Sequence, residues 1–392
     1  MIASGWKLAW QKVFDDRIAR PPTVDGSQML LVERADARPA TLQDTFLAID
    51  PRSGNLMWKI ADASNPVPHK ARYMLSIKSS PKYWLLLVQY VKPDGQSTPN
   101  PVQYELVVDR QSGRVVFDSG VSASGSAGAI AISDDALFDY YDGGQGGVFV
   151  GLVMRRVDLP AGTTRWMAPW DLRGPRGLFM VNDQLINFYE TEVQHYNPID
   201  GKLIKTAELD ILPIYNDIFI QDQIAVARSE SLAHPEKQGI QTFDLQNFTR
   251  KWFTKVSYRY QRDSNAFWGE IPSITVTPDS IYVFNARDTL LRLDLKTGNT
   301  LWATPSLGPE AMSRPVVMNG QAYGLFADGT IRAFSVADGS PVGIVARTPL
   351  WYWGGPDETR DFLDLIGGLG VADNTLIVTT GCRNVFALQR EP

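Results

Sequence analysis

A short repeated motif limits the folds that this chain can adopt. Each copy is an apolar strand ending in Asp, a turn that closes on Gly, and a second short strand ending in an aromatic residue. The two clearest copies run from Leu47 to Trp58 and from Leu291 to Trp302. The Asp side chain accepts hydrogen bonds from the turn backbone, and Gly supplies the left-handed conformation that closes a tight hairpin. Each copy therefore predicts an antiparallel hairpin.

Five further copies keep the spacing with some substitutions. The copies at 107–117 and 156–166 retain both the Gly and the aromatic residue. The copy that begins at Phe243 has Phe248 where the Gly is expected, and two weaker copies carry Lys205 and Gly343 where the aromatic residue is expected. An aromatic side chain at this position is large enough to fill the space between neighbouring twisted sheets. The repeats thus predict sheets that pack face to face.

A second hairpin with a tight polar turn precedes each copy of the motif. The seven intervals from Asp50 to the equivalent Gln389 average about 48 residues, the length of a four-stranded propeller blade. Alternating apolar segments such as 281–284 and 376–378 predict half-buried strands. The eight turns are Asp25-Gly26, Ser80-Pro81, Asp134-Asp135, Asn182-Asp183, Gln221-Asp222, Pro278-Asp279, Asn319-Gly320 and Asp373-Asn374.

The last repeat is one strand short at the C-terminus, and the segment Trp6–Trp10 supplies a matching strand at the other end of the chain. Pairing these ends closes the ring and leaves no bare sheet edge. The sequence therefore predicts an all-β fold, an eight-bladed β-propeller of four-stranded antiparallel blades, as a single domain over residues 1–392. The expected blades cover residues 20–60, 70–118, 127–167, 177–207, 217–254, 272–304, 313–345, and 367–390 plus 5–12.

The blade pattern, Asp-x-x-(Ser/Thr)-Gly followed by a strand that ends in Trp, resembles the pyrroloquinoline-quinone (PQQ)-type, or quinoprotein-like, propeller repeat. The resemblance extends from Trp6 to Leu388. Within that superfamily, the length and the eight-blade closure look like the BamB family, propeller lipoproteins of the outer-membrane barrel assembly machinery. The resemblance implies a bacterial repeat protein that acts as a protein-binding scaffold in cell-envelope protein assembly. The fold by itself does not determine function, because propellers host unrelated activities.

The order of the hairpins predicts that the two faces of the propeller differ. Turns within hairpins share one face and are all tight, whereas the connections between hairpins and between blades lie on the other face, the long-loop face. Insertions on that face are 35–43, 91–101, 140–147, 167–177, 228–239, 254–271 and 346–366, the last two being the longest.

The two longest loops contain the candidate partner-binding residues. Long loops on a rigid scaffold often carry binding sites, and Tyr, Trp and Arg side chains often anchor interfaces. We therefore predict a protein partner on the long-loop face; the alternatives are aromatic lids that fold over the blade ends, or loops that are merely exposed. The candidate residues are Tyr258, Arg259, Tyr260, Arg262, Phe267, Trp268, Trp351, Tyr352, Trp353 and Arg360.

The sequence favours a non-enzymatic scaffold without a catalytic residue, cofactor or metal. Cys382 is the only cysteine, so the adjacent Cys-Cys pair that resemblance to PQQ dehydrogenases implies is impossible. The glycine-rich stretch 143–147 lacks the Lys-Ser/Thr of a phosphate loop, and the acidic residues Asp357, Glu358 and Asp361 are typical of a solvated charge cluster. Two alternatives stay open: a small-ligand sensor or enzyme with a pocket at the mouth of the central channel, and a carbohydrate-binding propeller.

Charge and hydropathy restrict the partners further. The net charge of −5 disfavours nucleic-acid binding, which requires a basic surface. The longest apolar run, 83–88, is far shorter than the roughly 20 residues of a transmembrane helix. We expect a monomer or a member of a hetero-complex. The expected location is cytoplasmic if Met1 is the native start, and periplasmic or extracellular if a signal peptide has been removed.

Overall fold

The structure is a computed structural model, and all of its regular secondary structure in the described residues is β-strand. The strands form eight antiparallel sheets, which we call blades 1 to 8 in chain order. The fold is an eight-bladed β-propeller, as predicted. The described residues are 2–18, 21–34, 44–60, 72–90, 102–119, 130–142, 152–169, 177–189, 192–208, 213–229, 238–257, 274–309, 311–348, 367–380 and 383–391.

The chain divides into two compact units of four blades each. The first unit comprises Met1–Ala37, Asp44–Ser64 and Val256–Pro392, and the second comprises Arg38–Gln43 and Asn65–Lys255. Blades 1, 6, 7 and 8 belong to the first unit and blades 2 to 5 to the second. The organisation as a single domain stays a prediction.

The strands of the first unit follow the repeat, except that two short strands share the first position of blade 1. Both β2 and β3 pair with β4 there. The strands are β2 (Arg17–Ile18), β3 (Thr23–Asp25), β4 (Gln28–Arg34), β5 (Asp44–Ile49) and β6 (Leu56–Ile60) in blade 1; β23 (Ile274–Val276), β24 (Ser280–Phe284), β25 (Leu290–Asp294) and β26 (Thr300–Ala303) in blade 6; β27 (Val316–Met318), β28 (Gln321–Leu325), β29 (Thr330–Ser335) and β30 (Pro341–Arg347) in blade 7; and β31 (Gly367–Ala372), β32 (Thr375–Thr380), β33 (Asn384–Arg390) and β1 (Trp6–Val13) in blade 8.

The blades of the second unit each have four strands in sequence order. They are β7 (Arg72–Ser79), β8 (Tyr83–Tyr90), β9 (Val102–Asp109) and β10 (Val115–Asp118) in blade 2; β11 (Ala131–Ile132), β12 (Ala136–Asp142), β13 (Leu152–Asp158) and β14 (Thr163–Pro169) in blade 3; β15 (Gly177–Val181), β16 (Gln184–Tyr189), β17 (Glu192–Tyr196) and β18 (Leu203–Glu208) in blade 4; and β19 (Pro213–Gln221), β20 (Ile224–Ser229), β21 (Gly239–Asp244) and β22 (Thr249–Lys255) in blade 5.

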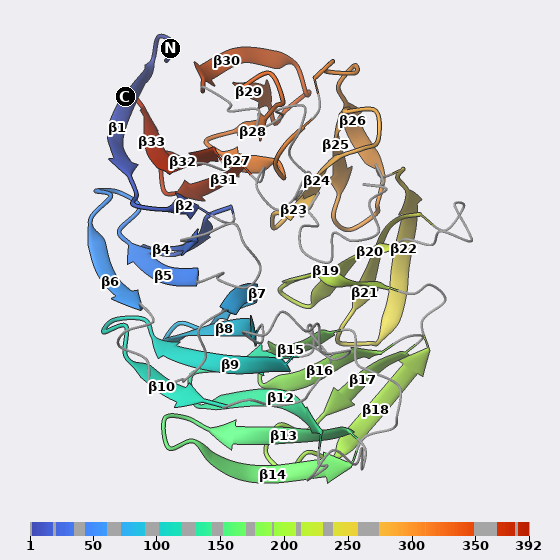
Figure 1. Cartoon of the computed structure of the whole chain (residues 1–392). Helices are drawn as coiled ribbons and strands as arrows, with labels where there is room; N and C mark the ends of the chain where they lie inside the picture. The colour runs from blue at the N-terminus through green and yellow to red at the C-terminus, as the bar shows by residue number, and fades with distance from the viewer. Residues whose placement is uncertain are drawn as a thin grey trace, which may run out of the picture. The chain divides into compact units, whose positions relative to one another are not determined.

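Pairing of the two chain ends completes blade 8. Strand β1 runs antiparallel to β33, with Trp6 opposite Arg390 and Gln11 opposite Phe386. Figure 1 shows the blue N-terminal strand beside the red C-terminal strand. The prediction that the N-terminal segment supplies the missing fourth strand is therefore confirmed.

Each blade has two different ends. Tight turns join its first strand to its second and, except in blade 8, its third to its fourth at one end, which we call the turn end. The second-to-third connections and the connections between blades leave from the opposite end, the loop end, because the strands are antiparallel. First strands of consecutive blades contact one another: β11 contacts β7 and β15 in the second unit, and β31 contacts β27 and β3 in the first. These strands are therefore the inner strands of the blades.

The repeated Gly and Trp act together at the tight turns. In blade 1, Gly54 has a φ of 73°, and its N–H donates to the Asp50 carbonyl at 2.8 Å. Trp10 from blade 8 packs on this glycine, where an added Cβ would lie 2.7 Å from the indole ring. The Trp10 indole N–H donates to the Pro51 carbonyl at 2.9 Å. The motif thus joins each such blade to the turn of the next one as well as shaping a hairpin.

At the contact between blades 4 and 5, both members of the Gly–Trp pair are replaced. Phe248, at the Gly position, has a φ of 58° and keeps the hydrogen bond from its N–H to the Asp244 carbonyl at 2.8 Å. Lys205, at the aromatic position, donates to the Asn247 carbonyl at 3.1 Å and lies 4.9 Å from the Phe248 ring centroid. His195 stacks on the same ring at 5.7 Å. Because no Trp covers the turn, the space is available to Phe248.

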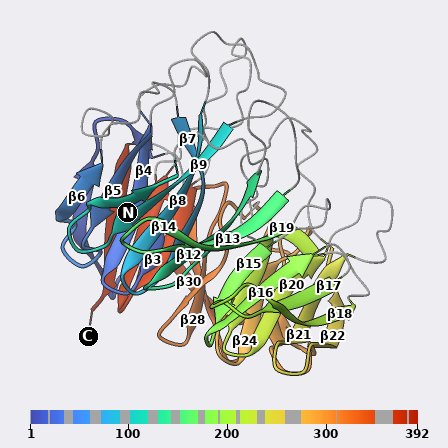
Figure 2. The same cartoon turned by 90° about the horizontal axis from the view of Figure 1, so that it is seen from below.

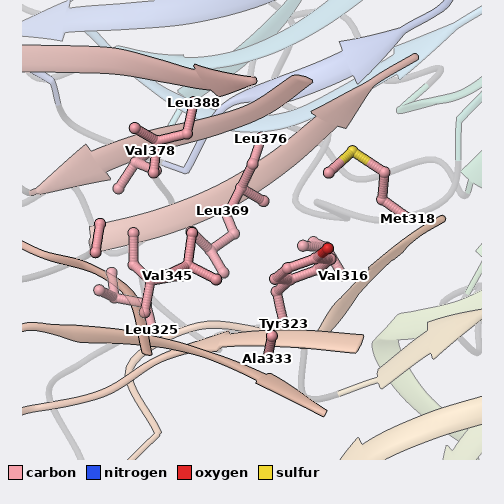
Figure 3. Packing of buried hydrophobic residues seen from close by; sticks show 12 residues of the cluster. Val316, Met318, Tyr323, Leu325, Ala333, Val345, Leu369, Leu376, Val378 and Leu388 are labelled. Carbon is pink, nitrogen blue, oxygen red and sulfur yellow. The ribbon is translucent and has the colours of Figure 1, made fainter. Parts of the chain in front are cut away.

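Apolar side chains between adjacent sheets form the core. In the first unit, Tyr323 and Leu325 of blade 7 pack with Leu369 and Leu376 of blade 8, and Figure 3 shows these side chains between the two sheets. In the second unit, blades 4 and 5 lie side by side in Figure 2, and Phe188 and Phe243 belong to their shared buried cluster. Burial of such faces stabilises a propeller blade by blade.

Candidate functional site

The ten predicted partner-binding residues lie outside the described residues. Tyr258, Arg259, Tyr260, Arg262, Phe267 and Trp268 belong to one of the two long loops, and Trp351, Tyr352, Trp353 and Arg360 to the other. The start of each loop is described. Strands β22 and β30 continue to Lys255 and Arg347, so they extend into both segments that the sequence assigned to loops.

The described residues that lead into these loops are fixed by backbone hydrogen bonds. The Ser257 carbonyl accepts from the Ala286 N–H of blade 6 at 2.8 Å, and the Thr348 N–H donates to the Gly329 carbonyl of blade 7 at 2.8 Å. The partners, Ala286 and Gly329, lie in the connections between the second and third strands of their blades, at the loop end. The two long loops therefore begin from an ordered base in the first unit.

A buried group of charged side chains lies between blades 2 and 3. On neighbouring strands of blade 3, Asp139 accepts two hydrogen bonds from the Arg155 Nε, at 2.7 and 3.0 Å, and one from its Nη2 at 2.6 Å. Glu105 of blade 2 is 3% exposed and Asp139 is 1% exposed. One Glu105 carboxylate oxygen has no hydrogen-bond partner among the described residues. Two buried carboxyl groups thus lie close to one guanidinium, which contacts Asp139 directly and acts on Glu105 through its charge.

This arrangement shifts the protonation equilibria of both acids. Burial, followed by the neighbouring Asp139 charge, raises the pKa of Glu105 from 4.5 to about 7. Burial also raises the pKa of Asp139, although its hydrogen bonds to Arg155 oppose that shift. Because Asp139 has the direct contacts with the cation, Glu105 is the carboxyl group that holds a proton near neutral pH. The pair titrates as a coupled unit.

Blade 1 contains a related ion pair between its second and third strands. Arg34 donates to Asp44 from Nε at 2.7 Å and from Nη2 at 3.0 Å, and the Asp44 side chain is fully buried. Glu33, the preceding residue, is 3% exposed and accepts from the Asp16 N–H at 2.9 Å. Buried charge at the loop end therefore occurs in both units, with different residues in each.

A lysine ties together the inner strands of the second unit. The Lys78 ammonium on β7 donates to the carbonyls of Ile130 and, at 3.1 Å, Leu178, which precede or lie within the first strands of blades 3 and 4. It also lies 4.7 Å from the Phe179 ring centroid. Burial lowers the pKa of Lys78 from 10.5 to about 8. The ammonium thus connects three blades by donating to backbone carbonyls near the inner strands of blades 3 and 4.

The sequence analysis missed these groups. The signal for them is a charged residue between apolar neighbours in the interior of a strand, as for Glu105 in 102–109 and Asp139 in 136–142. Such a residue indicates a buried polar contact, but the strand pattern does not say which side chain on another strand meets it. The pairing of Glu105 with Asp139 depends on how blades 2 and 3 pack.

The described ranges contain no group of metal-ligating side chains and no membrane-spanning helix. Among those residues, no three His, Cys, Asp or Glu side chains are grouped to hold a metal ion, and Asp139 is bound to Arg155. No helix in the same ranges has the length and apolarity needed to cross a bilayer. Cys382 and the glycine-rich stretch 143–147 fall outside the described residues.

The sequence of the chain matches a known repeat family over part of its length. Residues 150–323 match the family model described as outer membrane protein assembly factor BamB. This match confirms the predicted PQQ-like, BamB-like repeat. No sequence among the curated proteins matches the chain.

Solved structures support the propeller fold. BamB from Moraxella catarrhalis is 12% identical, with a TM-score of 0.60, covering 98% of this chain and 99% of that one. A europium-containing methanol dehydrogenase is 11% identical, with a TM-score of 0.58 and coverage of 98% and 93%. The C-terminal WD40 domain of Sif2 is 9% identical, with a TM-score of 0.57 and coverage of 99% of each chain.

These likenesses establish the fold, and the fold is compatible with several activities. In total 1318 solved chains match, and those named above include an assembly factor and an enzyme. A protein-binding role agrees with the BamB-like match, while the methanol dehydrogenase shows that a similar propeller can carry catalysis. Function has to be argued from the side chains of this chain.

Proposed function

We propose that the protein is a non-enzymatic scaffold that binds a protein partner through the loop end of its blades. The observation that carries the proposal is the difference between the two ends of each blade: the turn end has only tight turns, and every long connection leaves from the loop end. A rigid set of blades that presents long loops on one side is suited to recognition. The proposed contacts are made by the Tyr, Trp and Arg residues predicted from the sequence.

The described beginnings of the loops support this proposal. Ser257 and Thr348 are fixed by backbone hydrogen bonds to blades 6 and 7, so the loops that follow them start from defined positions. Anchoring of this kind reduces the conformational entropy that a loop loses when it binds a partner. The aromatic residues that follow have few rotatable bonds, which lowers that loss further.

The BamB-like match favours one cellular process for the proposed scaffold. Residues 150–323 match a family model named for outer-membrane protein assembly, and a solved BamB superposes over nearly the whole chain. We propose that this protein takes part in protein assembly at the bacterial cell envelope, as a component of a hetero-complex.

The test is capture of partners from a native lysate with the full-length chain and the double variant W351A/W353A. We expect the parent protein to retain a partner that the double variant loses, because truncation of central aromatic residues removes most of the binding energy at such surfaces. The matched control is L301A, which truncates a side chain on β26 that is 48% exposed but lies outside the loops. L301A should keep the partner.

Thermal unfolding of the double variant distinguishes a partner-binding surface from aromatic lids that cover the blade ends. If Trp351 and Trp353 cover the blade ends, the double variant unfolds at a lower temperature and still retains every partner that the parent captures. That result would contradict the proposed interface.

A further inference from the structure

The amide oxygen of Asn187 is buried without a hydrogen-bond donor. Asn187 lies on β16 of blade 4 and is 0% exposed. Its Nδ2 group donates to the Gln194 Oε1 atom at 3.1 Å, whereas its Oδ1 atom has no partner among the described residues. A buried acceptor that lacks a donor destabilises a protein, so a ligand that donates to this oxygen would be favourable.

A chain of hydrogen bonds fixes the orientation of this amide. The Gln194 Nε2 group donates to the Glu192 carboxylate at 3.0 Å, and an ionised carboxylate accepts hydrogen bonds but does not donate them. The other side of the Gln194 amide is therefore its oxygen, which accepts from the Tyr196 hydroxyl at 3.1 Å as well as from Asn187. Because Asn187 directs Nδ2 toward that oxygen, its own Oδ1 is the atom left without a donor.

Two glutamates beside this amide carry negative charge without a paired cation. Glu192 on β17 is directly opposite Glu208 on β18. Side chains in opposite positions on antiparallel strands are neighbours on one face of the sheet, and like charges there destabilise the pair. Within the described ranges, neither glutamate forms an ion pair with a lysine, an arginine or a histidine. A bound cation would relieve this repulsion.

The unpaired oxygen and the two carboxylates lie on the same face of blade 4. Asn187 is opposite Gln194 in the strand register, and Gln194 is two residues from Glu192, so the three side chains point to one face. Glu192 begins β17 and Glu208 ends β18, which places both carboxylates at the loop end. The acceptors therefore run from exposed Glu208, through partly buried Glu192, to buried Asn187.

Aromatic rings from two blades close the buried end of this row of acceptors. Tyr196 of blade 4 and Tyr140 of blade 3 belong to one buried cluster, and they are 7% and 3% exposed. Burial raises the pKa of both hydroxyl groups, so the two phenols stay neutral near pH 7. Because these rings exclude water on one side, a cation interacts more strongly with the carboxylates than it does in bulk solvent.

We propose that Asn187, Glu192 and Glu208 form a binding site for a primary ammonium group at the loop end of blade 4. An ammonium group has three N–H donors and a positive charge, which match one amide oxygen and the two carboxylates. Small alkylamines carry this group, and so do the lysine side chains of other proteins. The site lies outside the two long aromatic loops, so the inference is independent of the proposed function.

Isothermal titration calorimetry of the full-length chain with butylammonium chloride tests the proposal. Sodium chloride keeps the ionic strength constant, so general screening of charge stays the same. We expect saturable binding of butylammonium. Butyltrimethylammonium chloride is the matched probe, because it carries the same charge without an N–H donor, and it should not bind.

Three variants locate the site. In N187L the affinity for butylammonium should fall about tenfold or more, because a buried acceptor is lost. E192Q should weaken binding about fivefold, since one of the two carboxylates is neutralised. The matched control is D183N, because Asp183 is an exposed carboxylate at the turn end of blade 4. D183N changes the net charge as E192Q does, and it should leave binding unchanged.

The N187L variant is expected to fold, because it removes an unsatisfied polar group from the interior. Its circular dichroism spectrum and unfolding temperature are compared with those of the parent protein. If N187L does not fold, the double variant E192Q/E208Q carries the test, since Glu192 is partly buried and Glu208 is exposed. The double variant should weaken binding more than E192Q does.

Several outcomes would overturn the proposal: no saturable binding of butylammonium by the parent, equal binding of the two cations, unchanged binding in N187L, or equal weakening in D183N and E192Q. Calcium chloride is titrated in the same way, and binding of calcium without binding of butylammonium also overturns it. A last titration distinguishes the two sources of the ammonium group. Tighter binding of N-acetyl-lysinamide than of butylammonium supports a lysine side chain of a partner protein, and the reverse order supports a small amine.

Discussion

Two adjacent arginines in blade 3 show how the two ends of the blades differ. Arg156 donates to Asp158 and Asp135, each at 2.9 Å, and to the Pro198 carbonyl of the next blade at 3.1 Å. Arg155, the preceding residue on β13, donates to the buried Asp139. Arg156 therefore binds residues at the turn end, and Arg155 binds the buried carboxylate toward the loop end.

The turn-end contacts of Arg156 recur at equivalent positions of blade 6. The buried ion pair of blade 1, Arg34–Asp44, uses different residues from the Glu105–Asp139–Arg155 group. Arg292 in blade 6 repeats the contacts of Arg156, with Asp279 in place of Asp135 and the Val336 carbonyl in place of that of Pro198. These partners are largely exposed: Asp135 is 71% exposed and Asp279 is 72% exposed. Repetition identifies the turn-end contacts as part of the blade-to-blade joint, whereas the Glu105–Asp139–Arg155 group is a departure from the repeat.

The largest expected loss of stability tests whether burial makes the ion pair near the loop end stronger than the exposed one at the turn end. D139A should lower the free energy of unfolding by about 3–5 kcal/mol, because it leaves the Arg155 cation buried without its carboxylate. D135A, which removes an exposed carboxylate at the turn end, should cost less than about 1 kcal/mol. Chemical denaturation of both variants at pH 7 measures the two values. Equal losses in the two variants would show that burial does not distinguish the two ends.

A smaller effect, dependent on pH, is expected from Glu105. Its pKa is raised from 4.5 to about 7 in the folded chain, so the folded state holds a proton that the unfolded chain releases. The stability that this group contributes is fully present below pH 4.5 and is lost as the pH rises to about 7. E105Q imitates the protonated form, so it should be more stable than the parent at pH 8 by up to about 3 kcal/mol.

The measurement for E105Q is the free energy of unfolding at pH 5 and at pH 8. The two proteins should differ little at pH 5 and clearly at pH 8. E192Q on β17 serves as the control, since Glu192 is only partly buried. A parent protein whose advantage over E105Q grows with pH would contradict the assigned protonation state.

The smallest effect concerns two glycines in blade 7 that share a left-handed backbone. Gly320 has a φ of 71° and open space around it, and Gly339 has a φ of 74° with Trp302 beside it, where an added Cβ would lie 2.6 Å from the indole ring. G320A should cost about 1 kcal/mol for the backbone alone. G339A should cost about 1–3 kcal/mol more, because the indole must move. Thermal and chemical denaturation of both variants isolate this difference, and equal costs would remove the Trp–Gly contact from the blade joint.

Much of the fold could be predicted because its determinants are local. The Asp and Gly of each turn are a few residues apart, and their hydrogen bonds form within one hairpin, as between Asp50 and Gly54. The pairing of the chain ends was also predictable, because an incomplete last repeat and an extra strand at the start are both visible in the sequence. The spacing of the repeat predicted the Phe248 turn. Its contacts with Lys205 and His195 could not be predicted, because they form only when two blades pack together.

The candidate site could be predicted only in part. The loop end follows from the order of hairpins, which is a property of the repeat. The partner-binding side chains of the two longest loops stay a prediction. The buried groups Glu105–Asp139 and Arg34–Asp44 escaped sequence reasoning, since a charge inside an apolar strand does not reveal its partner on another strand.

By itself the sequence determined the repeat length, the turns, the number of blades and the strand that closes the last one. Only the tertiary structure decided that Glu105 lies close to the Asp139–Arg155 pair and that Lys78 donates to carbonyls of two other blades. The physical reason is the range of the interactions. Turn hydrogen bonds act between near neighbours in the chain, whereas burial and charge pairing depend on residues that only the packing of separate blades brings together.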